Sequence, residues 1–322
     1  MSCNRLLASL SAAIMATWAA AAPPPDDVAK RDAALVDSLR RGREALEWTD
    51  ESVWHDWRLQ RRPGTDACRV LGPDDRVVCE GTADHCQQAF GAQQRPLPTR
   101  GDVVILLHGL GEGRRSMQPL AAALRSSLDA TVMSFGYASV RADIDAHAKS
   151  LGAVVAGLPK ANRISFVGHS LGNLVVRRWM AVAAAEDIAR VRRMVMLGPP
   201  NQGADLARMA GKIWGLAPQA RGAARDLAID WDEVAPGLAV PSCEFGIVAG
   251  GRGDDAGYSP LLAGDDDAVV RVAETRLDGA TDFLLLPVHH ASMMDHPEVQ
   301  RATATFLRDG KFPERSAGEG PR

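Results

Sequence analysis

One serine of this 322-residue chain lies in a setting that could activate it as a nucleophile. Ser170 is the centre of Gly168-His169-Ser170-Leu171-Gly172, after a short apolar run and before a segment with helical apolar spacing. In such a strand, turn and helix the serine hydroxyl is exposed, and the flanking glycines let the backbone pass close to its neighbours. The helix would direct its N-terminal N–H groups at a developing oxyanion, with the Leu171 N–H as first donor. The predicted chemistry is attack by Ser170 on an acyl carbon.

A second oxyanion donor is expected after the apolar run Asp102–Leu107, which is typical of a buried strand. This run ends in His108-Gly109-Leu110-Gly111. Glycines in the loop after such a strand let the backbone turn an N–H inward, toward the reacting carbonyl. The Leu110 N–H is the candidate donor, and His108 is expected to be structural.

A serine hydroxyl is a poor nucleophile at neutral pH, so a histidine must accept its proton. Of the eight histidines, only His289 and His290 directly follow an apolar run near the C-terminus. A loop at the carboxyl edge of a sheet would carry them toward Ser170. His296 precedes Pro297 and is expected to begin a helix. The base is therefore expected at position 289 or 290.

The third group needed is a carboxylate that orients the imidazole. Asp265, Asp266 and Asp267 lie between the serine and these histidines in the sequence. A run of three aspartates is otherwise typical of a solvated loop or of a calcium site, so only one need act as the acid. Asp254 and Asp255 are weaker alternatives, and the residues alone leave the choice open.

The elements that must position these groups alternate between strand and helix, which predicts an α/β fold with a mostly parallel sheet and helices on both faces. Strands are expected at 102–107, 130–135, 163–167, 191–197, 242–248 and 282–288. Helices are expected at 116–127, 144–157, 170–185, 223–227 and 297–307. Residues 202–241 interrupt this pattern and are expected to form a small inserted lid. Four residues are candidates to line an apolar substrate pocket: Met117, Trp214, Leu216 and Met293.

From about residue 100 to about residue 310, the chain resembles bacterial lipases and esterases of the α/β-hydrolase fold. The matching motifs are His-Gly-Leu-Gly at 108–111, Gly-His-Ser-Leu-Gly at 168–172, Gly-Pro-Pro-Asn-Gln-Gly at 198–203, Asp-Ala-Val-Val at 267–270 and His-Ala-Ser-Met-Met at 290–294. The resemblance implies Ser170 as nucleophile, Asp267 as acid and His290 as base. It also implies oxyanion donors at Leu110 and Leu171. Relatives usually carry glycine where this chain has Ala268.

The N-terminal part is organised differently. Residues 1–22 combine an early arginine, an apolar run and a small-residue end, which is typical of a signal peptide; an uncleaved membrane anchor is the alternative. Residues 23–99 are expected to form an extension with a helix and a β-hairpin, ahead of a catalytic domain over 100–312 and a flexible tail over 313–322. Within the extension we expect a helix at 33–48, a strand at 53–61, a hairpin at 68–79 and a connector at 87–100. The strands are expected to lie at the edge of the main sheet.

Cysteines favour disulfide bonds in an exported chain. Without the signal peptide the chain keeps Cys68, Cys79, Cys86 and Cys243, an even number. Cys68 and Cys79 flank the turn signal at 72–75, so we expect them to face each other across a hairpin and to bond, leaving Cys86 for Cys243. A zinc site is not favoured, because no C-x-x-C pair is present.

Composition excludes some classes of function. Hydrophobic residues make up 46% and charged residues 24% of the chain, as in soluble globular proteins, and the net charge of −3 with no basic stripe argues against a nucleic-acid partner. The sequence therefore predicts a periplasmic or secreted hydrolase of small-molecule or lipid esters that contacts a lipid interface transiently and needs no metal or organic cofactor. A thioesterase, amidase or acyltransferase with the same triad is the alternative. A non-catalytic scaffold that binds lipid or a partner is the alternative of another class.

Overall fold

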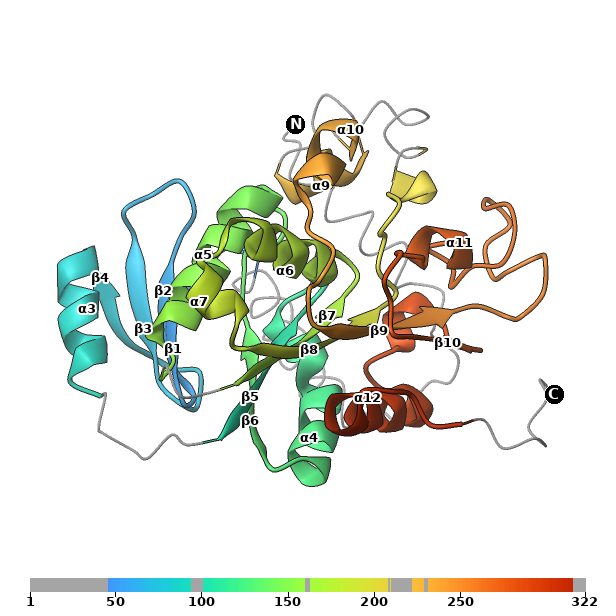
Figure 1. The fold of residues 1–322 in the computed structure, drawn as a ribbon. Coiled ribbons are helices and arrows are strands. Elements are labelled where there is room, and N and C mark those ends of the chain that lie inside the picture. Colours follow the sequence, from blue (N-terminus) through green and yellow to red (C-terminus); the bar gives the residue numbers. More distant parts are fainter. Residues whose placement is uncertain are drawn as a thin grey trace, which may run out of the picture. The chain divides into compact units, whose positions relative to one another are not determined.

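A computed structural model describes residues 46–93, 101–159, 163–207, 209, 222–228 and 231–314. The predicted signal peptide, most of the predicted helix at 33–48 and the end of the predicted tail lie outside these residues. The described part of the chain contains two β-sheets, one of six strands and one of four. Figure 1 shows both sheets with the helices that flank them.

The six strands of the larger sheet are all parallel, in the order β10-β9-β8-β7-β5-β6. They are β5 (Asp102–Leu107), β6 (Ala130–Phe135), β7 (Ile164–His169), β8 (Val191–Leu197), β9 (Glu244–Gly250) and β10 (Asp282–Leu286). The prediction of an α/β fold with a mostly parallel sheet is confirmed, and each predicted strand lies within two residues of the observed one at either end. Parallel strands share a carboxyl edge, so the loops that follow them gather on one side of the molecule.

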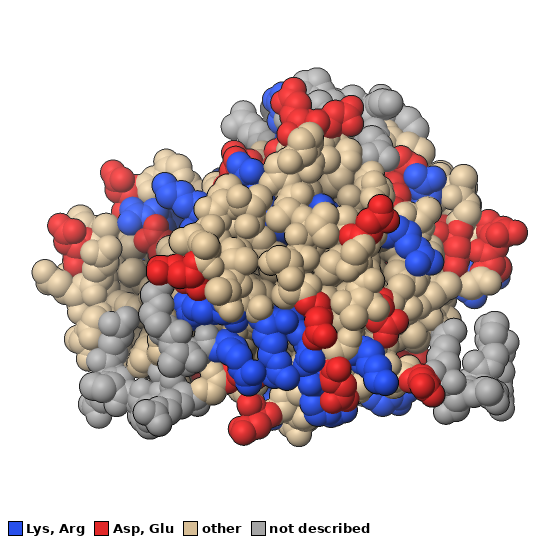
Figure 2. All heavy atoms as spheres, viewed as in Figure 1, with Lys and Arg blue, Asp and Glu red and all other residues tan. Residues whose placement is uncertain are grey.

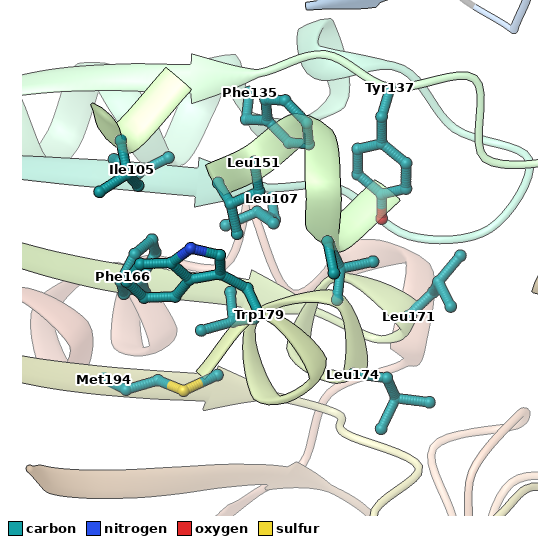
Figure 3. Close-up of a cluster of buried hydrophobic side chains, with 14 of the residues drawn as sticks. Ile105, Leu107, Phe135, Tyr137, Leu151, Phe166, Leu171, Leu174, Trp179 and Met194 are labelled. Carbon is teal, nitrogen blue, oxygen red and sulfur yellow. The ribbon is translucent and has the colours of Figure 1, made fainter. Parts of the chain in front are cut away.

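Helices cover both faces of this sheet (Figure 1). One side carries α5 (Ile144–Gly157) and α6 (Leu171–Val182), and the other carries α4 (Gln118–Ser127) and α12 (Pro297–Asp309). The strands are therefore apolar on both faces: Val103 of β5 packs toward α5 and α6, whereas its neighbour Val104 packs toward α4 and α12. Figure 3 shows the first of these two cores, in which the rings of Phe166 and Trp179 lie 5.2 Å apart.

Local signals explain where these helices begin and end. Asp143 precedes α5 and its carboxylate accepts a hydrogen bond from the Ala146 N–H at 2.8 Å, as an N-terminal cap should. Pro297 is the first residue of α12, a position where the missing N–H costs nothing. Gly310 follows that helix with a φ of 81°, in the left-handed region that glycine adopts most readily.

The smaller sheet is antiparallel and separate from the larger one. It consists of β1 (Thr49–Trp54), β2 (Trp57–Arg61), β3 (Cys68–Leu71) and β4 (Val77–Gly81), followed by α3 (Ala83–Gly91). The prediction that these strands extend the edge of the main sheet is wrong. The single strand predicted at 53–61 is a hairpin that turns at His55, whose φ is 54°, and no glycine marks this turn. The connector predicted at 87–100 begins inside α3, and residues 94–100 lie outside the described ranges.

The disulfide pairing predicted from the hairpin is also wrong. All four described cysteines are free thiols. Strands β3 and β4 pair in a register that sets Cys68 opposite Gly81 and Val70 opposite Cys79. The sulfur of Cys79 instead lies 3.7 Å from that of Cys86.

Cys86 packs in the small core of the four-stranded sheet, whereas Cys243 packs against the core of the six-stranded one. The predicted bond between Cys86 and Cys243 would therefore join residues of two different cores.

The remaining described elements are short. They are η2 (Arg114–Met117), α7 (Ala185–Ile188), α9 (Ala223–Ala228), α10 (Trp231–Val234), η4 (Ala235–Gly237), α11 (Val272–Thr275) and η5 (His290–Ser292). Of the predicted lid at 202–241, the structure describes α9, α10, η4 and the segments beside them, and the Ala223 N–H donates to the Ala142 carbonyl at 2.8 Å. Among the described helices, none has the length and apolar character to cross a bilayer.

Arginine and lysine side chains gather near β8 and α12 on the face drawn in Figure 2, with acidic side chains among them. Arg192 of β8 contacts Asp102 at 2.7 Å, and Arg193 contacts Glu244 at 2.7 Å. Because these arginines are ion-paired, much of the positive charge there is compensated within the protein.

Candidate active site

Ser170 lies in a sharp turn between β7 and α6. Its φ of 50° and ψ of −120° lie in a region that non-glycine residues rarely adopt, so the turn is strained. A Cβ atom at Gly168 would come within 2.3 Å of the Asn173 amide oxygen, and one at Gly172 would come within 2.5 Å of the Leu107 carbonyl oxygen. Only glycine therefore fits on either side of the serine, which explains the Gly-x-Ser-x-Gly spacing.

The carboxylate of Asp267 contacts the imidazole of His290. The His290 Nδ1 lies 2.7 Å from the Asp267 Oδ2, and the His290 N–H donates to the Asp267 carbonyl at 2.8 Å. The other oxygen of Asp267 accepts hydrogen bonds from the N–H groups of Val269 and Val270, at 3.0 and 2.7 Å. Asp267 is fully buried, so these contacts fix one orientation of its carboxylate toward the imidazole.

This contact sets the protonation behaviour of His290. Burial by itself disfavours the charged imidazolium and lowers the pKa of His290. The charge and hydrogen bond of Asp267, with a smaller contribution from Glu112, outweigh burial, so the pKa of His290 is raised above its ordinary value of 6.5. An imidazole in this environment is a stronger base than a free one.

The alternative acids make other contacts. The Asp265 carboxylate accepts from the N–H groups of Arg252 and Gly253, at 2.7 and 2.9 Å. The Asp266 carboxylate accepts from the N–H groups of Ser259 and Ala268, at 2.9 and 2.7 Å. Both aspartates therefore stabilise the loop that presents their neighbour to the imidazole.

Asp254 lies in the same region and accepts from the N–H groups of Ala256 and Gly257, at 2.9 and 3.0 Å. The alternative base, His289, is exposed, and its ring lies against that of Tyr258, with 3.9 Å between centroids and 39° between the ring planes. None of these contacts involves Asp267 or His290.

Ala268 adopts a backbone conformation that favours glycine. Its φ is 82°, in the left-handed region, where a side chain costs about 1 kcal/mol. Glycine in the relatives would adopt this conformation without strain. The conformation turns the next two N–H groups back onto the Asp267 carboxylate.

The serine turn and the Asp267–His290 pair meet at the carboxyl ends of β7 and β8. His169 lies next to Ser170, its Nε2 is 3.1 Å from the His290 carbonyl oxygen, and the two imidazole rings are 4.6 Å apart. Gly198 follows β8, and a Cβ atom there would lie 3.0 Å from the His290 Nδ1 and 3.2 Å from the Asp267 Oδ2. All three predicted triad residues therefore come from one small region of the sheet edge.

The segment His108–Glu112, termed the oxyanion loop below, follows β5 and contacts the serine turn. A Cβ atom at Gly109 would lie 3.3 Å from that of Ser170. The Gly109 N–H donates to the Glu112 carboxylate at 3.1 Å, and the Gly111 N–H donates to the Ser139 hydroxyl at 3.0 Å.

Between them lies Leu110, the predicted donor. Within the described ranges, the N–H groups of Leu110 and of Leu171 donate no hydrogen bond to the protein. No acceptor in the described part of the chain therefore occupies either N–H group.

Glu112 is a member of the site that sequence reasoning missed. Its carboxylate also accepts from the Ser116 hydroxyl at 2.8 Å and lies 3.4 Å from the His169 Nδ1. Burial raises the pKa of Glu112, but the contact with His169 and the hydrogen bonds from Gly109 and Ser116 outweigh it, so the pKa lies well below its ordinary range. The only signal in the sequence is its place directly after His-Gly-Leu-Gly, which does not by itself indicate a role.

The predicted apolar pocket is corrected in part. Met117 and Met293 are fully buried in the core formed with α4 and α12. Both methionines lie close in sequence to the motifs because they pack beneath the site, and their side chains are closed off from solvent. Trp214 and Leu216 lie outside the described residues.

Comparisons with known proteins agree with the fold. Residues 100–198 match the family described as "Putative serine esterase (DUF676)". No curated protein matches the sequence.

The solved structures that resemble this one include the following three. Phospholipase PlaB from Legionella pneumophila is 16% identical over 66% of this chain and 60% of that chain, with a TM-score of 0.51. The mature form of Bacillus licheniformis lipase BlEst2 is 18% identical over 67% of this chain and 94% of that chain, with a TM-score of 0.48. The metagenomic carboxyl esterase MGS0156 is 18% identical over 62% and 69%, with a TM-score of 0.45.

The chain has the α/β-hydrolase fold, and its resemblance to lipases and esterases of that fold is confirmed. The family match and the fold together support a serine hydrolase.

Proposed function

We propose that this protein is an exported serine hydrolase that cleaves carboxylic esters, with Ser170 as nucleophile, His290 as base and Asp267 as acid. The observation that carries the proposal is the 2.7 Å contact between Asp267 and His290 beside a strained serine turn. This arrangement matches the roles that acyl transfer requires, because the carboxylate fixes the tautomer in which the other imidazole nitrogen can accept a proton. Export is proposed on the character of residues 1–22 alone.

The proposed reaction has two halves. The Ser170 oxygen attacks the ester carbonyl carbon while His290 accepts the hydroxyl proton, and the carbonyl oxygen becomes an oxyanion held by the Leu110 and Leu171 N–H groups. His290 then gives its proton to the leaving alkoxide, and the acyl group remains on Ser170. In the second half His290 removes a proton from water, whose oxygen attacks the acyl carbon. Collapse of this second intermediate releases the carboxylic acid and returns the proton to Ser170.

Two partly exposed valines belong to the loops around the site. Val269 is 36% exposed, and its N–H donates to the Asp267 carboxylate, so it lies beside the site. Val140 is 37% exposed and follows Ser139, which binds the oxyanion loop. We propose that these two side chains contact the hydrocarbon part of the substrate.

The test is hydrolysis of p-nitrophenyl esters, from acetate to palmitate, by the purified protein and by Ser170→Ala. The wild type is expected to turn over at least one ester, and Ser170→Ala is expected to lose turnover while its melting temperature stays close to the wild-type value. Activity in Ser170→Ala near the wild-type rate would remove Ser170 from the mechanism. If the folded wild type hydrolyses thioesters or amides but none of these esters, the proposed substrate class is wrong. The assignment of the three catalytic residues would still stand.

Adjacent aspartates supply a matched pair of variants for the acid. Asp267→Asn should lower kcat by about 10⁴-fold, because an amide fixes the wrong imidazole tautomer. Asp266→Asn makes the same carboxylate-to-amide change at the preceding residue, whose carboxylate accepts hydrogen bonds from the N–H groups of Ser259 and Ala268. It should cost less in kcat than Asp267→Asn, and the reverse order would show that the acid is misassigned.

A further inference from the structure

The small N-terminal sheet presents a buried charge to the catalytic domain. Asp50 of β1 is fully buried, and its carboxylate accepts from the Arg58 guanidinium at 2.5 Å, the Gln60 amide at 2.8 Å and the Gly136 N–H at 2.7 Å. The Asp50 N–H donates to the Gly136 carbonyl at 2.8 Å. Both backbone polar groups of Gly136 are therefore held by one residue of β1.

Neighbouring groups strengthen this junction. The Thr49 hydroxyl accepts from the Ala138 N–H at 3.0 Å, and the Arg58 guanidinium donates to the Ser134 carbonyl at 2.8 Å. Arg58 is only 4% exposed, so the ion pair with Asp50 lies in a largely water-free environment. Burying such a pair costs free energy that an apolar contact would not, so stability alone gives little reason for it.

The segment held by β1 binds the oxyanion loop on its other side. Residues Gly136–Ser139, termed the β6 loop, follow β6 directly. Within it, the Tyr137 hydroxyl donates to the His108 carbonyl. The backbone N–H of Tyr137 lies 3.3 Å from the His108 Nε2, and the rings of Tyr137 and His108 stack with 4.1 Å between their centroids. The Ser139 hydroxyl accepts from the Gly111 N–H at 3.0 Å. Contacts at 108 and 111 thus flank Leu110 on both sides.

A second link joins the same sheet to the end of the oxyanion loop. Asp75, in the turn between β3 and β4, pairs with Arg114 and, at 2.7 Å, with Arg115. Both arginines belong to η2, which begins two residues after Glu112. The four-stranded sheet therefore contacts the oxyanion loop through the β6 loop and through η2.

We propose that Asp50 is a positioning residue: through Gly136 and the β6 loop it holds the Leu110 N–H where the oxyanion develops. This inference rests on the proposed function. An oxyanion donor acts only if it is held in place before the reaction, and removal of one such donor typically costs about 10²–10³-fold in kcat. Loosening the loop without removing the donor should cost less. The N-terminal sheet, which lies outside the segment that matches the esterase family, thereby becomes part of the catalytic architecture.

Asp50→Asn tests the link with little change in shape. The amide keeps one acceptor oxygen and places an NH₂ group against donors, so at least one bond from Gly136, Arg58 or Gln60 is lost. Glu51→Gln is the matched control, because Glu51 lies next in the same strand, is half-exposed and pairs with Arg61 at 2.5 Å.

Two measurements are needed, one of the flexibility of the oxyanion loop and one of catalysis. The first is amide hydrogen exchange of a peptide that covers 108–112, compared with one from β8. The second is kcat and KM on the best p-nitrophenyl ester. Asp50→Asn is expected to speed exchange at 108–112 and to lower kcat about 10-fold or more with KM nearly constant, while Glu51→Gln stays within about 2-fold of the wild type.

If Asp50→Asn does not fold, Thr49→Val and Ser139→Ala replace it. Thr49→Val removes the hydrogen bond from the Ala138 N–H to β1, and Ser139→Ala removes the one from the Gly111 N–H to the β6 loop. Unchanged exchange at 108–112 in the folded variants would overturn the proposal whatever the activity. A fall in kcat for Glu51→Gln equal to that for Asp50→Asn would also overturn it, because general loosening of β1 would then explain both. Faster exchange in a protein whose wild type shows no Ser170-dependent turnover would instead refute the proposed function and leave only the mechanical link.

Discussion

A single methyl group at Gly198 should disturb the catalytic pair without removing any functional group. Gly198 follows β8 directly and has a φ of 51°. A Cβ atom there would lie 3.0 Å from the His290 Nδ1, 3.1 Å from its Cε1 and 3.2 Å from the Asp267 Oδ2. Gly198→Ala therefore pushes a methyl group against both partners of the 2.7 Å hydrogen bond.

The size of the effect follows from two contributions. Alanine in the left-handed region costs about 1 kcal/mol of folding free energy. Relief of the contacts requires His290 to move by a few tenths of an ångström, because ordinary contacts to a methyl carbon begin near 3.4 Å. A displacement of about 1 Å in a catalytic group can cost about 10²-fold in rate, so this smaller shift should lower kcat by about 10-fold.

Gly64→Ala separates the two contributions. Gly64 has a φ of 74°, and a Cβ atom there meets nothing within 4 Å, so alanine carries the backbone cost without the contact. Melting temperature and kcat are measured for both variants. Both should melt a few degrees lower, about the shift that 1 kcal/mol gives, but only Gly198→Ala should lose kcat. Wild-type kcat in Gly198→Ala, or an equal loss in both variants, would refute the geometry.

Three further predictions use other groups. Because Asp267 and Glu112 raise the pKa of His290 against the effect of burial, kcat/KM should fall as the pH drops through a value above 6.5, and a pH–rate profile with its acid limb below 6.5 would contradict this. Burial lowers the pKa of His147 to about 3, so only the unfolded state binds a proton there between pH 6.5 and 3; the free energy of unfolding should fall by up to about 1.4 kcal/mol per pH unit as the pH drops through this window. His147→Gln should make urea unfolding less pH-dependent there, and an unchanged pH dependence would show that His147 is not the group. Glutathione disulfide should join Cys79 to Cys86, whose sulfurs lie 3.7 Å apart, and non-reduced peptide mapping that links either one to Cys243 would refute that pairing.

Much of the larger sheet could be predicted because its strands are buried on both faces. Runs such as Asp102–Leu107 are apolar at nearly every position, so they are recognisable without knowledge of their partners. The serine turn was equally recognisable, because steric contacts at Gly168 and Gly172 demand glycine. Resemblance to a known family then distinguished Asp267 and His290 from their neighbours.

Other features depend on contacts between distant segments, which a single sequence does not show. The hairpin at His55 carries no turn glycine, and the pairing register of β3 and β4 decides which residue faces Cys68. Nothing in the spacing of residues indicates that Asp50 contacts Gly136, which lies 86 positions later. The role of Glu112 is visible only once the loop that contains it is seen beside His169.

Activation of Ser170 can be measured directly by labelling with a fluorophosphonate, which reacts with serines activated for acyl transfer. We expect one phosphonylated peptide, with the label on Ser170, and loss of labelling in Ser170→Ala and in His290→Ala. A label on another serine, or a folded wild-type protein that takes up no label, would contradict this expectation.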